Sequence, residues 1–441
     1  MDAIIQQSRA LHGTVTLSPD KSICHRVVLA AALAHGTTEI VPWPDADDCQ
    51  RTLEVVQRLG VSVQSFPGRI TIQGRGVEGL RAPTQELFCG ESGTTLRLVA
   101  GVLAGQPFTS KLSAGPSLSR RPMQRIAEPL TQMGARLEGT TRSTPQELYP
   151  PLTIHGCRPL RAIRYELPVA SAQVKSAILL AGLAAEGKTT IVEPIQTRDH
   201  TERMLRHYGL RVDRHGDEIT LTPGLLRAQG TLQIPGDFSS AAFFVVVASC
   251  VPNSCLTLPR VSLNPTRTGL LRVLERMGAS IRIDDVQEQW EPRGTLTVES
   301  RQLRAITLTA EEVPGVIDEL PILMVAAACA QGTSRLYGLG ELRVKETDRI
   351  QSMVTGLQRL GAPIRLIGGD AVEIAGGALV GHEVDSAGDH RTAMSLAVAG
   401  VLAKGQTIIR GAECAAKSFP EFFTLLREVA GSSTVKTVDK V

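Results

Sequence analysis

Clusters of basic and hydroxyl side chains stand immediately before apolar, alanine-rich segments in this chain. The first cluster is Ser18–Arg26, in which Lys21 and Arg26 lead into the apolar segment. The same order recurs at Glu91–Arg97 and at Ser171–Lys175. A basic side chain in the first turn of a helix opposes the helix dipole, whereas an anion bound there is stabilised. The pattern therefore predicts helix N-termini that bind an anionic ligand.

Three weaker copies of this pattern follow in the second half of the chain. They occupy Gly236–Ser240, Val316–Glu319 and Gly388–Arg391. Any single copy is also compatible with ordinary N-capping, because Ser, Thr and Asp side chains accept hydrogen bonds from the free N–H groups of a helix start. The cations exceed what a cap requires, which favours an anion as the common ligand.

Length and composition limit the class of protein. A chain of 441 residues exceeds one ordinary core and predicts two domains. A formal charge of +3 and an aromatic content of 3% argue against a nucleic-acid partner. The apolar runs span only about 9–13 residues, too few to cross a bilayer. The N-terminus lacks the features of a signal peptide, so we expect a cytoplasmic protein with no membrane partner.

The cysteines do not form a recognisable framework. Eight are scattered along the chain with no C-x-x-C pair and no histidine at zinc-finger spacing. This predicts reduced thiols and neither a metal site nor a set of disulfides.

A second repeated signal divides the chain into similar units. A Leu-Gly, Met-Gly or Tyr-Gly pair followed by alternating apolar residues recurs about every 75 residues, as is typical of a helix end followed by a strand. This period is longer than that of solenoid repeats, so each unit must be a small fold of its own. The pattern predicts an α/β fold of six βαβαββ units, three in each domain. The glycines of these pairs are Gly60, Gly134, Gly209, Gly278 and Gly361, with a fainter copy at Gly431.

The domain boundaries are expected where the chain is rich in proline and glycine. One crossing is predicted near Pro19 and Asp20, and the other within Gly230–Gly236. The N-terminal domain is therefore residues 21–235, and the C-terminal domain is residues 1–20 with 236–431. Residues 432–441 are polar and are expected to form a flexible tail.

Together these motifs identify a family. The chain resembles the 5-enolpyruvylshikimate-3-phosphate (EPSP) synthases along nearly its whole length. The motifs that carry the resemblance are Asp20–Arg26, Ser92–Arg97, Arg121–Met123, Ser171–Lys175, Arg198–Glu202, Asn264–Arg267, Leu342–Arg349, Asp389–Arg391 and Ala416–Pro420.

The resemblance implies a two-domain inside-out α/β barrel whose domains close on their ligands like a clamp. It implies transfer of the enolpyruvyl group of phosphoenolpyruvate to the 5-hydroxyl of shikimate 3-phosphate in the shikimate pathway, with release of phosphate. No metal or organic cofactor is implied. The expected protein is a monomer with two small-molecule substrates and with glyphosate as an inhibitor.

The resemblance also implies site residues, transferred position by position. Asp318 and Glu346 match the acid/base pair, and Lys21 is a further candidate proton donor. The shikimate 3-phosphate positions are Lys21, Ser22, Arg26, Ser171, Ala172, Gln173, Thr197, Asp318 and Lys345. The phosphoenolpyruvate positions are Lys21, Gly93, Arg121, Gln173, Arg349, Arg391 and Lys417.

Some positions depart from the commonest family pattern. Ala172 stands where many members have serine, so one hydroxyl contact to the phosphate is missing. Leu98 follows Arg97 where proline is common. Such changes resemble the divergent branch associated with glyphosate tolerance, although Gly93 is not the alanine that crowds the herbicide in the best-known members of that branch.

Two alternatives remain open from the residues alone. UDP-N-acetylglucosamine enolpyruvyl transferases share the fold and the donor, but they carry a cysteine in a mobile loop, and Ala114–Met123 contains none. A non-catalytic anion-binding protein on the same fold is the other alternative, disfavoured because the residues that match the catalytic positions are all present.

Overall fold

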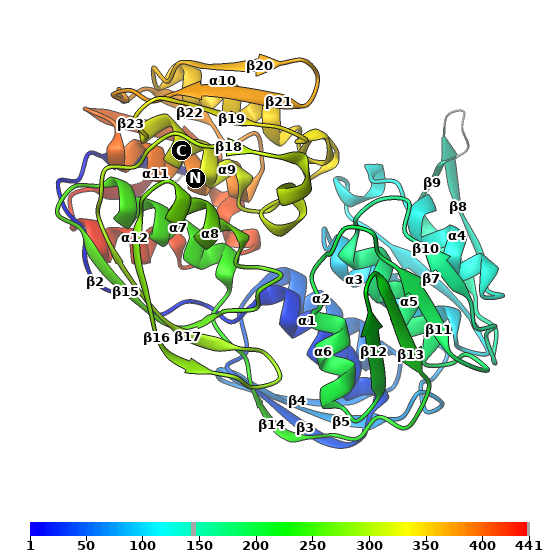
Figure 1. Ribbon diagram of the computed structural model, residues 1–441. Coiled ribbons are helices and arrows are strands. Elements are labelled where there is room, and N and C mark those ends of the chain that lie inside the picture. Colours follow the sequence, from blue (N-terminus) through cyan, green and yellow to red (C-terminus); the bar gives the residue numbers. More distant parts are fainter. Residues whose placement is uncertain (143–146, 439–441) are drawn as a thin grey trace. The chain divides into compact units, whose positions relative to one another are not determined.

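The computed structural model describes residues 1–142 and 147–438 (Figure 1). The chain folds as two compact units, which we call unit 1 (residues 1–18 and 235 onwards) and unit 2 (residues 19–234). The divisions fall after Ser18 and after Ile234, whereas the sequence pattern places them after residues 20 and 235.

Unit 2 alternates helices and strands along the chain. Its elements are α1 (Lys21–Leu33), β3 (His35–Val41), α2 (Asp47–Arg58), β4 (Ser62–Phe66), β5 (Arg69–Arg75), β6 (Leu87–Phe88), α3 (Gly93–Ala104), β7 (Thr109–Ser113), η1 (Leu118–Arg120), α4 (Gln124–Gln132), β8 (Arg136–Arg142), β9 (Glu147–His155), β10 (Arg164–Glu166), α5 (Ala172–Gly182), β11 (Thr189–Val192), α6 (His200–His207), β12 (Arg211–His215), β13 (Glu218–Thr222) and β14 (Gly230–Gln233).

Unit 1 has the same alternation. Its elements are β1 (Asp2–Gln6), β2 (His12–Thr14), α7 (Phe238–Cys250), β15 (Cys255–Ser262), α8 (Gly269–Arg276), β16 (Ser280–Gln287), β17 (Arg293–Glu299), β18 (Thr307–Leu308), η2 (Ala310–Gly315), α9 (Leu320–Cys329), β19 (Thr333–Leu336), η3 (Gly340–Val344), α10 (Arg349–Arg359), β20 (Ile364–Ile367), β21 (Ala371–Ala375), β22 (Glu383–Asp385), α11 (His390–Leu402), β23 (Gln406–Arg410), η4 (Ala412–Lys417), α12 (Phe422–Ala430) and β24 (Val435–Val438).

The six four-stranded sheets of the described chain share one strand order. In the sheet β6-β7-β9-β8 the first pair is parallel and the other two pairs are antiparallel. The chain passes through this sheet as β6-α3-β7-α4-β8-β9, which is the predicted βαβαββ order. The sheets β10-β11-β13-β12 and β18-β19-β21-β20 repeat it. The predicted α/β fold class is therefore confirmed.

The segments beside the two chain crossings supply the missing first strands. Strand β2 precedes α1 in the sequence but pairs in parallel with β15 of unit 1. Strand β14 precedes α7 but pairs in parallel with β3 of unit 2. Each unit thus completes one sheet with a strand from a distant part of the chain.

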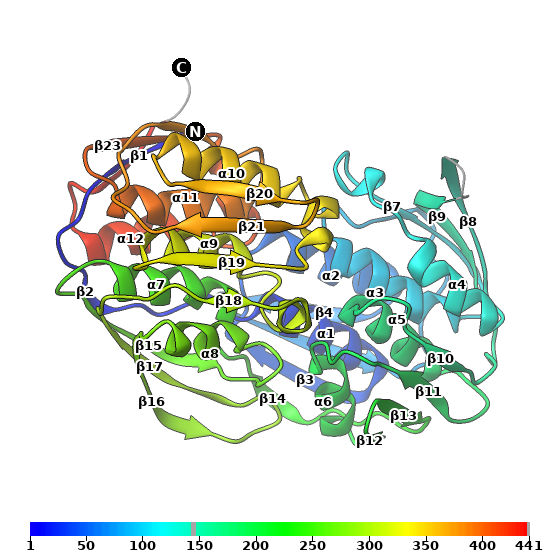
Figure 2. The same cartoon turned by 45° about the horizontal axis from the view of Figure 1, so that its top comes forward.

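The expectation of a flexible tail from residue 432 is wrong for its described part. Strand β24 pairs antiparallel with β1, so that Ile4 lies opposite Lys436 (Figure 2 shows β1 beside β23). Strand β24 is the last strand of the sheet β22-β23-β1-β24, as β8 is the last strand of the sheet β6-β7-β9-β8. The tail is polar because only Val435 faces the core, and backbone pairing needs no apolar side chain. Residues 439–441 lie outside the described part of the chain.

Three helices in each unit are buried along almost their whole length. They are α1, α3 and α5 in unit 2 and α7, α9 and α11 in unit 1. A helix that is apolar on every side must be covered on every side, whereas helices such as α2 and α6 have one polar face. Close packing also needs small residues: a Cβ on Gly101 of α3 would lie 2.2 Å from the carbonyl oxygen of Ala177 in α5.

The predicted glycine stops are also present. All six glycines of the repeated pairs have positive φ, from 83° at Gly361 to 112° at Gly134.

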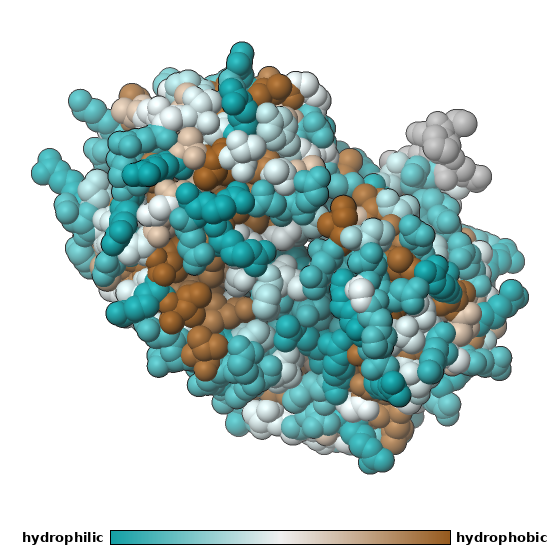
Figure 3. Space-filling view, viewed as in Figure 1, coloured by the Kyte–Doolittle hydropathy of each residue, from teal (hydrophilic) through white to brown (hydrophobic). Residues whose placement is uncertain are grey.

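The face shown in Figure 3 is mainly hydrophilic with scattered apolar groups. Among the described residues, no helix is both long and apolar enough to cross a membrane.

The β24 pairing predicts a stability effect. A chain ending after Gly431 should unfold at a lower temperature than the full chain, because it exposes the edge of β1 and removes buried Val435, whose burial alone contributes about 2 kcal/mol. A chain ending after Val438 is the control and should unfold like the full chain. Equal unfolding temperatures for all three chains, by calorimetry, would show that β24 contributes nothing.

Candidate active site

Unit 2 brings the N-termini of its three buried helices together. The carboxamide of Gln173, in the first turn of α5, donates through Nε2 to the Thr94 hydroxyl of α3 at 3.0 Å. Its Oε1 accepts from Arg97 Nη1 at 2.8 Å. Both ends of the carboxamide are therefore held by α3, which fixes the orientation of this predicted ligand residue.

Arg26 links α1 to two further helices. Its guanidinium donates to the Ser22 carbonyl at 2.8 Å, the Thr201 hydroxyl at 2.8 Å and the Ser176 hydroxyl at 3.0 Å. The side chain is buried. The predicted ligand residues Ser22 and Arg26 are thus joined, although Arg26 reaches Ser22 through the backbone carbonyl.

The helix starts of unit 2 are capped without any acid in their first turns. Asp20, Ser92 and Ser171 cap α1, α3 and α5 by accepting a backbone N–H, and none of the three first turns contains Asp or Glu. Ala172 is the first residue of α5. Because a helix N-terminus carries partial positive charge, these ends favour an anion.

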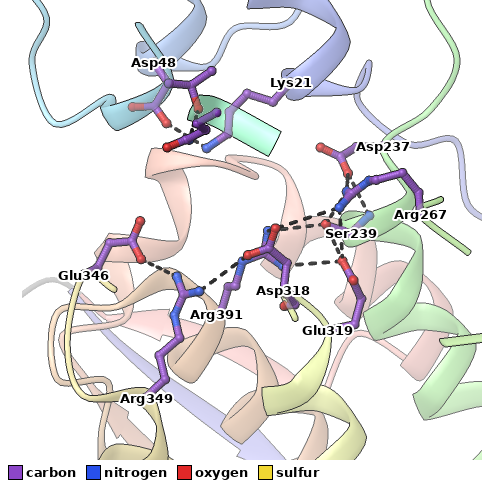
Figure 4. A network of polar contacts seen from close by, with 12 residues as sticks. Lys21, Asp48, Asp237, Ser239, Arg267, Asp318, Glu319, Glu346, Arg349 and Arg391 are labelled. Atoms are coloured by element: carbon purple, nitrogen blue, oxygen red, sulfur yellow. Dashed lines mark hydrogen bonds and ion pairs between the residues drawn. The ribbon is translucent and has the colours of Figure 1, made fainter. Parts of the chain in front are cut away.

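Lys21 has a carboxylate partner that the sequence pattern assigned to another role. Its ammonium lies 2.7 Å from Asp48 Oδ2 (Figure 4). As acids at a helix start, Asp47 and Asp48 are predicted from the sequence to cap the helix that follows, but α2 has no side-chain cap and Asp47 pairs with Arg51 instead. The missed partner of Lys21 is therefore Asp48.

A buried hydrogen-bonded chain supports the start of α3. His25 Nδ1 lies 2.6 Å from the Thr52 hydroxyl, which lies 2.7 Å from the Thr95 hydroxyl, and Thr95 contacts Ser92. Burial lowers the pKa of His25 to about 3, although Asp48 opposes the shift. His25 is therefore neutral at physiological pH and acts as a fixed packing and hydrogen-bonding group.

Gly93 occupies a position where an added side chain would press against two arginine side chains. A Cβ there would lie 2.7 Å from Arg97 Nη1 and 3.1 Å from Arg121 Nη1. The backbone of the first α3 residue is thus directly below two guanidinium groups. This brings the predicted phosphoenolpyruvate residues Gly93 and Arg121 together.

From the sequence alone, Lys175 could be either a solvated helix residue or a ligand, but the structure buries it. It is fully buried, with its ammonium 2.8 Å from Glu193 Oε1 and 2.8 Å from Glu202 Oε1. Glu193 also accepts from both the backbone N–H and the hydroxyl of Thr197. The backbone N–H and the hydroxyl of Thr197, a predicted phosphate ligand, therefore both donate to the Glu193 carboxylate. Arg214 forms an ion pair with the second oxygen of that carboxylate.

Unit 1 has a network of arginines and acids at the corresponding helix starts (Figure 4). Arg349 is buried, with Nε 2.8 Å from Asp389 Oδ2, Nη2 2.5 Å from Glu346 Oε2 and Nη1 3.7 Å from Asp318 Oδ1. Burial would lower the pKa of Arg349, but Glu346, Asp389 and Asp318 raise it above its ordinary value. Burial would likewise raise the pKa of Asp389, and Arg349 and His390 lower it.

Asp318 directly precedes α9 and lies among three guanidinium groups. Its Oδ2 is 3.8 Å from both Arg267 Nη1 and Arg391 Nη2, and Arg349 lies beside Oδ1. Arg391 also donates to the Asp318 carbonyl oxygen at 2.6 Å. The Asp318 carboxylate therefore forms ion pairs with arginines from three separate segments of unit 1.

The two predicted lysines of unit 1 lie at the ends of short helices. Lys345 follows η3 and is half-buried. Lys417 ends η4, is exposed, and donates to the Gly388 carbonyl at 3.1 Å, just before α11.

Sequence reasoning missed several members of the unit 1 network. Arg267, Ser239 and Glu319 connect the starts of α7 and α9. Each lies within a motif noted from the sequence, but nothing in the spacing showed that these side chains meet. Within residues 1–142 and 147–438, no group of three His, Cys, Asp or Glu side chains is placed to hold a metal ion.

Comparisons with known proteins agree on one family. Residues 5–426 match the family described as EPSP synthase (3-phosphoshikimate 1-carboxyvinyltransferase). A 3-phosphoshikimate 1-carboxyvinyltransferase of Bacillus anthracis (strain A0248) is 44% identical over 424 residues, covering 96% of this chain and 98% of the relative. One of Coxiella burnetii (strain CbuK_Q154) is 46% identical over 425 residues, covering 96% and 95%. A solved EPSP synthase from Acinetobacter baumannii superimposes with a TM-score of 0.88 at 41% identity, covering 99% of each chain.

The buried Lys175 predicts a large stability effect. Lys175→Met should lower the free energy of unfolding by about 3–5 kcal/mol, because it leaves Glu193 and Glu202 buried without their cation. Lys188→Met, at an exposed lysine of the same unit, is the control and should change little. Denaturant unfolding should be measured for both variants. Equal stability of the two variants would contradict the structural role of Lys175.

Proposed function

The chain belongs to the EPSP synthase family, and we propose how its residues divide the work of that family's reaction. The enzyme transfers the enolpyruvyl group of phosphoenolpyruvate to shikimate 3-phosphate in the shikimate pathway. The observation that carries the assignment of roles is the position of Asp318, a carboxylate held among three guanidinium groups at a helix start.

Shikimate 3-phosphate is assigned mainly to unit 2. Its phosphate would be held at the start of α5 by Ser171, the backbone N–H of Ala172 and Gln173, because this helix start carries the partial positive charge of the helix dipole and contains no acid. Lys21, Ser22 and Arg26 would contact the rest of the molecule. Thr197 would have to turn its hydroxyl away from Glu193 to reach the phosphate. Unit 1 would contribute Asp318 and Lys345.

Phosphoenolpyruvate carries a phosphate and a carboxylate, and both suit bidentate arginines. In unit 2 we assign it to Lys21, Arg121, Gln173 and the backbone of Gly93, which has no side chain to block the approach of a ligand. In unit 1 we assign it to Arg349, Arg391 and Lys417.

The proposed chemistry is addition followed by elimination. Asp318 takes the proton of the 5-hydroxyl while that oxygen bonds to C2 of phosphoenolpyruvate, and Glu346 or Lys21 gives a proton to C3. This forms a tetrahedral intermediate in which C2 carries both the phosphate group and the oxygen of the former 5-hydroxyl. The roles then reverse: the group that protonated C3, Glu346 or Lys21, takes a proton back from C3, the bond between C2 and the phosphate oxygen breaks as the double bond re-forms, and Asp318 returns its proton to the departing phosphate. Positioned acid/base groups contribute about 10²–10⁴-fold, and the preorganised arginines stabilise the developing charge.

Three further assignments accompany this mechanism. We propose that glyphosate competes with phosphoenolpyruvate and that the enzyme acts as a monomer. We also propose a cytoplasmic location: all eight cysteines lie in the described part of the chain as free thiols, which suits a reducing compartment.

A phosphate-release assay tests the function directly. With phosphoenolpyruvate present, shikimate 3-phosphate should give phosphate and UDP-N-acetylglucosamine should not. Release with UDP-N-acetylglucosamine would indicate the related transferase, and release with neither acceptor would indicate a non-catalytic protein.

The role of Asp318 predicts a selective kinetic loss. Asp318→Asn should lower kcat at least about 100-fold, because the amide cannot accept the hydroxyl proton, while the KM for phosphoenolpyruvate changes much less. Asp370→Asn, at an exposed carboxylate of the same unit, is the control. Equal losses in kcat and in phosphoenolpyruvate affinity would contradict a role as base.

The crowding at Gly93 predicts an effect on glyphosate. Gly93→Ala should raise the glyphosate inhibition constant about 5–150-fold, and more than the KM for phosphoenolpyruvate, because the methyl group crowds Arg97 and Arg121 and the longer ligand has less room. Gly369→Ala, where a Cβ meets open space, is the control. A wild-type enzyme unaffected by glyphosate, with no change in Gly93→Ala, would show that substitutions such as Leu98 decide tolerance.

A further inference from the structure

We propose that Ser239 is a positioning residue for Arg391, and that it sets the affinity for phosphoenolpyruvate without touching the ligand. This inference rests on the proposed function, in which Arg391 binds phosphoenolpyruvate. Ser239 lies in the first turn of α7 and is buried. It stands at the junction of the three buried helices of unit 1 (Figure 4).

The Ser239 hydroxyl has three charged neighbours. Its Oγ lies 2.6 Å from Arg267 Nη2, 3.3 Å from Arg391 Nη2 and 2.5 Å from Glu319 Oε1. Arg267 lies just before α8, Arg391 lies in the first turn of α11, and Glu319 lies at the start of α9. One hydroxyl therefore connects all three charged groups.

Hydrogen counting fixes the direction of each bond. A guanidinium group only donates, so both arginines must donate to Ser239 Oγ. The hydroxyl has one hydrogen, which must then go to Glu319, the only one of the three neighbours that accepts. Ser239 consequently cannot rotate without leaving an arginine or the buried Glu319 with a lost hydrogen bond.

The same contacts hold Arg391 at two points. Its Nη1 donates to the Asp318 carbonyl at 2.6 Å, and its Nη2 donates to Ser239. Glu319 Oε1 lies 3.8 Å from Arg391 and 3.9 Å from Arg267, so one buried carboxylate lies between the two cations. Without Ser239 the guanidinium of Arg391 could turn toward Glu319 or Asp318 and away from an incoming anion.

A hydroxyl deletion tests this role. Ser239→Ala should raise the KM for phosphoenolpyruvate about 10–100-fold, the range expected for losing hydrogen bonds between charged groups. The kcat should fall less than KM rises, and the dissociation constant of shikimate 3-phosphate measured alone should stay within about threefold. A purely structural role would lower the unfolding temperature and change the affinity for both substrates together.

The matched control lies on the same helix. Ser249 is also buried in α7, but its hydroxyl donates to the Val245 carbonyl of its own helix, at the other end. Ser249→Ala should leave both substrate affinities unchanged. An equal rise in the KM for phosphoenolpyruvate in both serine variants would overturn the proposal.

Two further variants keep the test decisive. If Ser239→Ala does not fold, Glu319→Gln tests the same hydrogen bonds. Its amide oxygen can still accept from Ser239, so the KM for phosphoenolpyruvate should stay within about threefold of the wild-type value. A larger rise in that KM would show that the charge of Glu319, not the Ser239 hydroxyl, holds Arg391. Arg391→Met separates the two hypotheses. If it leaves the KM for phosphoenolpyruvate unchanged, the proposed role of Arg391 fails. If it raises that KM while Ser239→Ala does not, only the inference about Ser239 fails.

Discussion

The burial of three apolar helices in each unit is the constraint on which the rest of the structure depends. A helix that is apolar on every side has only its ends available for polar groups, so function is confined to those ends. In unit 2 the starts of α1, α3 and α5 are joined by Arg26, Arg97 and Gln173. Small residues such as Gly101, which packs against Ala177, allow the helices to lie close together and so bring their starts into contact.

The two units differ in the residues that cap these buried helices. In unit 2 the caps of α3 and α5 are the neutral hydroxyls of Ser92 and Ser171, and only α1 is capped by an acid, Asp20. In unit 1 the arginines already face carboxylates, as Arg349 faces Asp389 and Glu346. The partial positive charge at the starts of α3 and α5 therefore remains available to an anion, whereas unit 1 holds its charged groups in a preorganised network suited to proton transfer and to stabilising developing charge.

The sequence predicted those features that recur or that depend on one residue type. The repeated polar clusters predicted the helix starts, and glycines such as Gly134 predicted the helix ends because the required backbone conformation favours glycine. Contacts between distant side chains were not predictable from such patterns. Lys175 lies in a motif with partly exposed ligand candidates, yet it is buried between Glu193 and Glu202, which belong to later segments of the chain. Strand β24 was missed because its alternation is too weak to distinguish a paired edge strand from a tail.

If the serine-capped starts of α3 and α5 recognise a phosphate group, that group must supply much of the affinity for shikimate 3-phosphate. Titration calorimetry of shikimate 3-phosphate and of shikimate, each without phosphoenolpyruvate and at two salt concentrations, tests it most directly. The account predicts that shikimate 3-phosphate binds at least about 100-fold more tightly than shikimate, and that added salt weakens its binding. Equal affinity for the two compounds, or binding of shikimate 3-phosphate that is insensitive to salt, would contradict it.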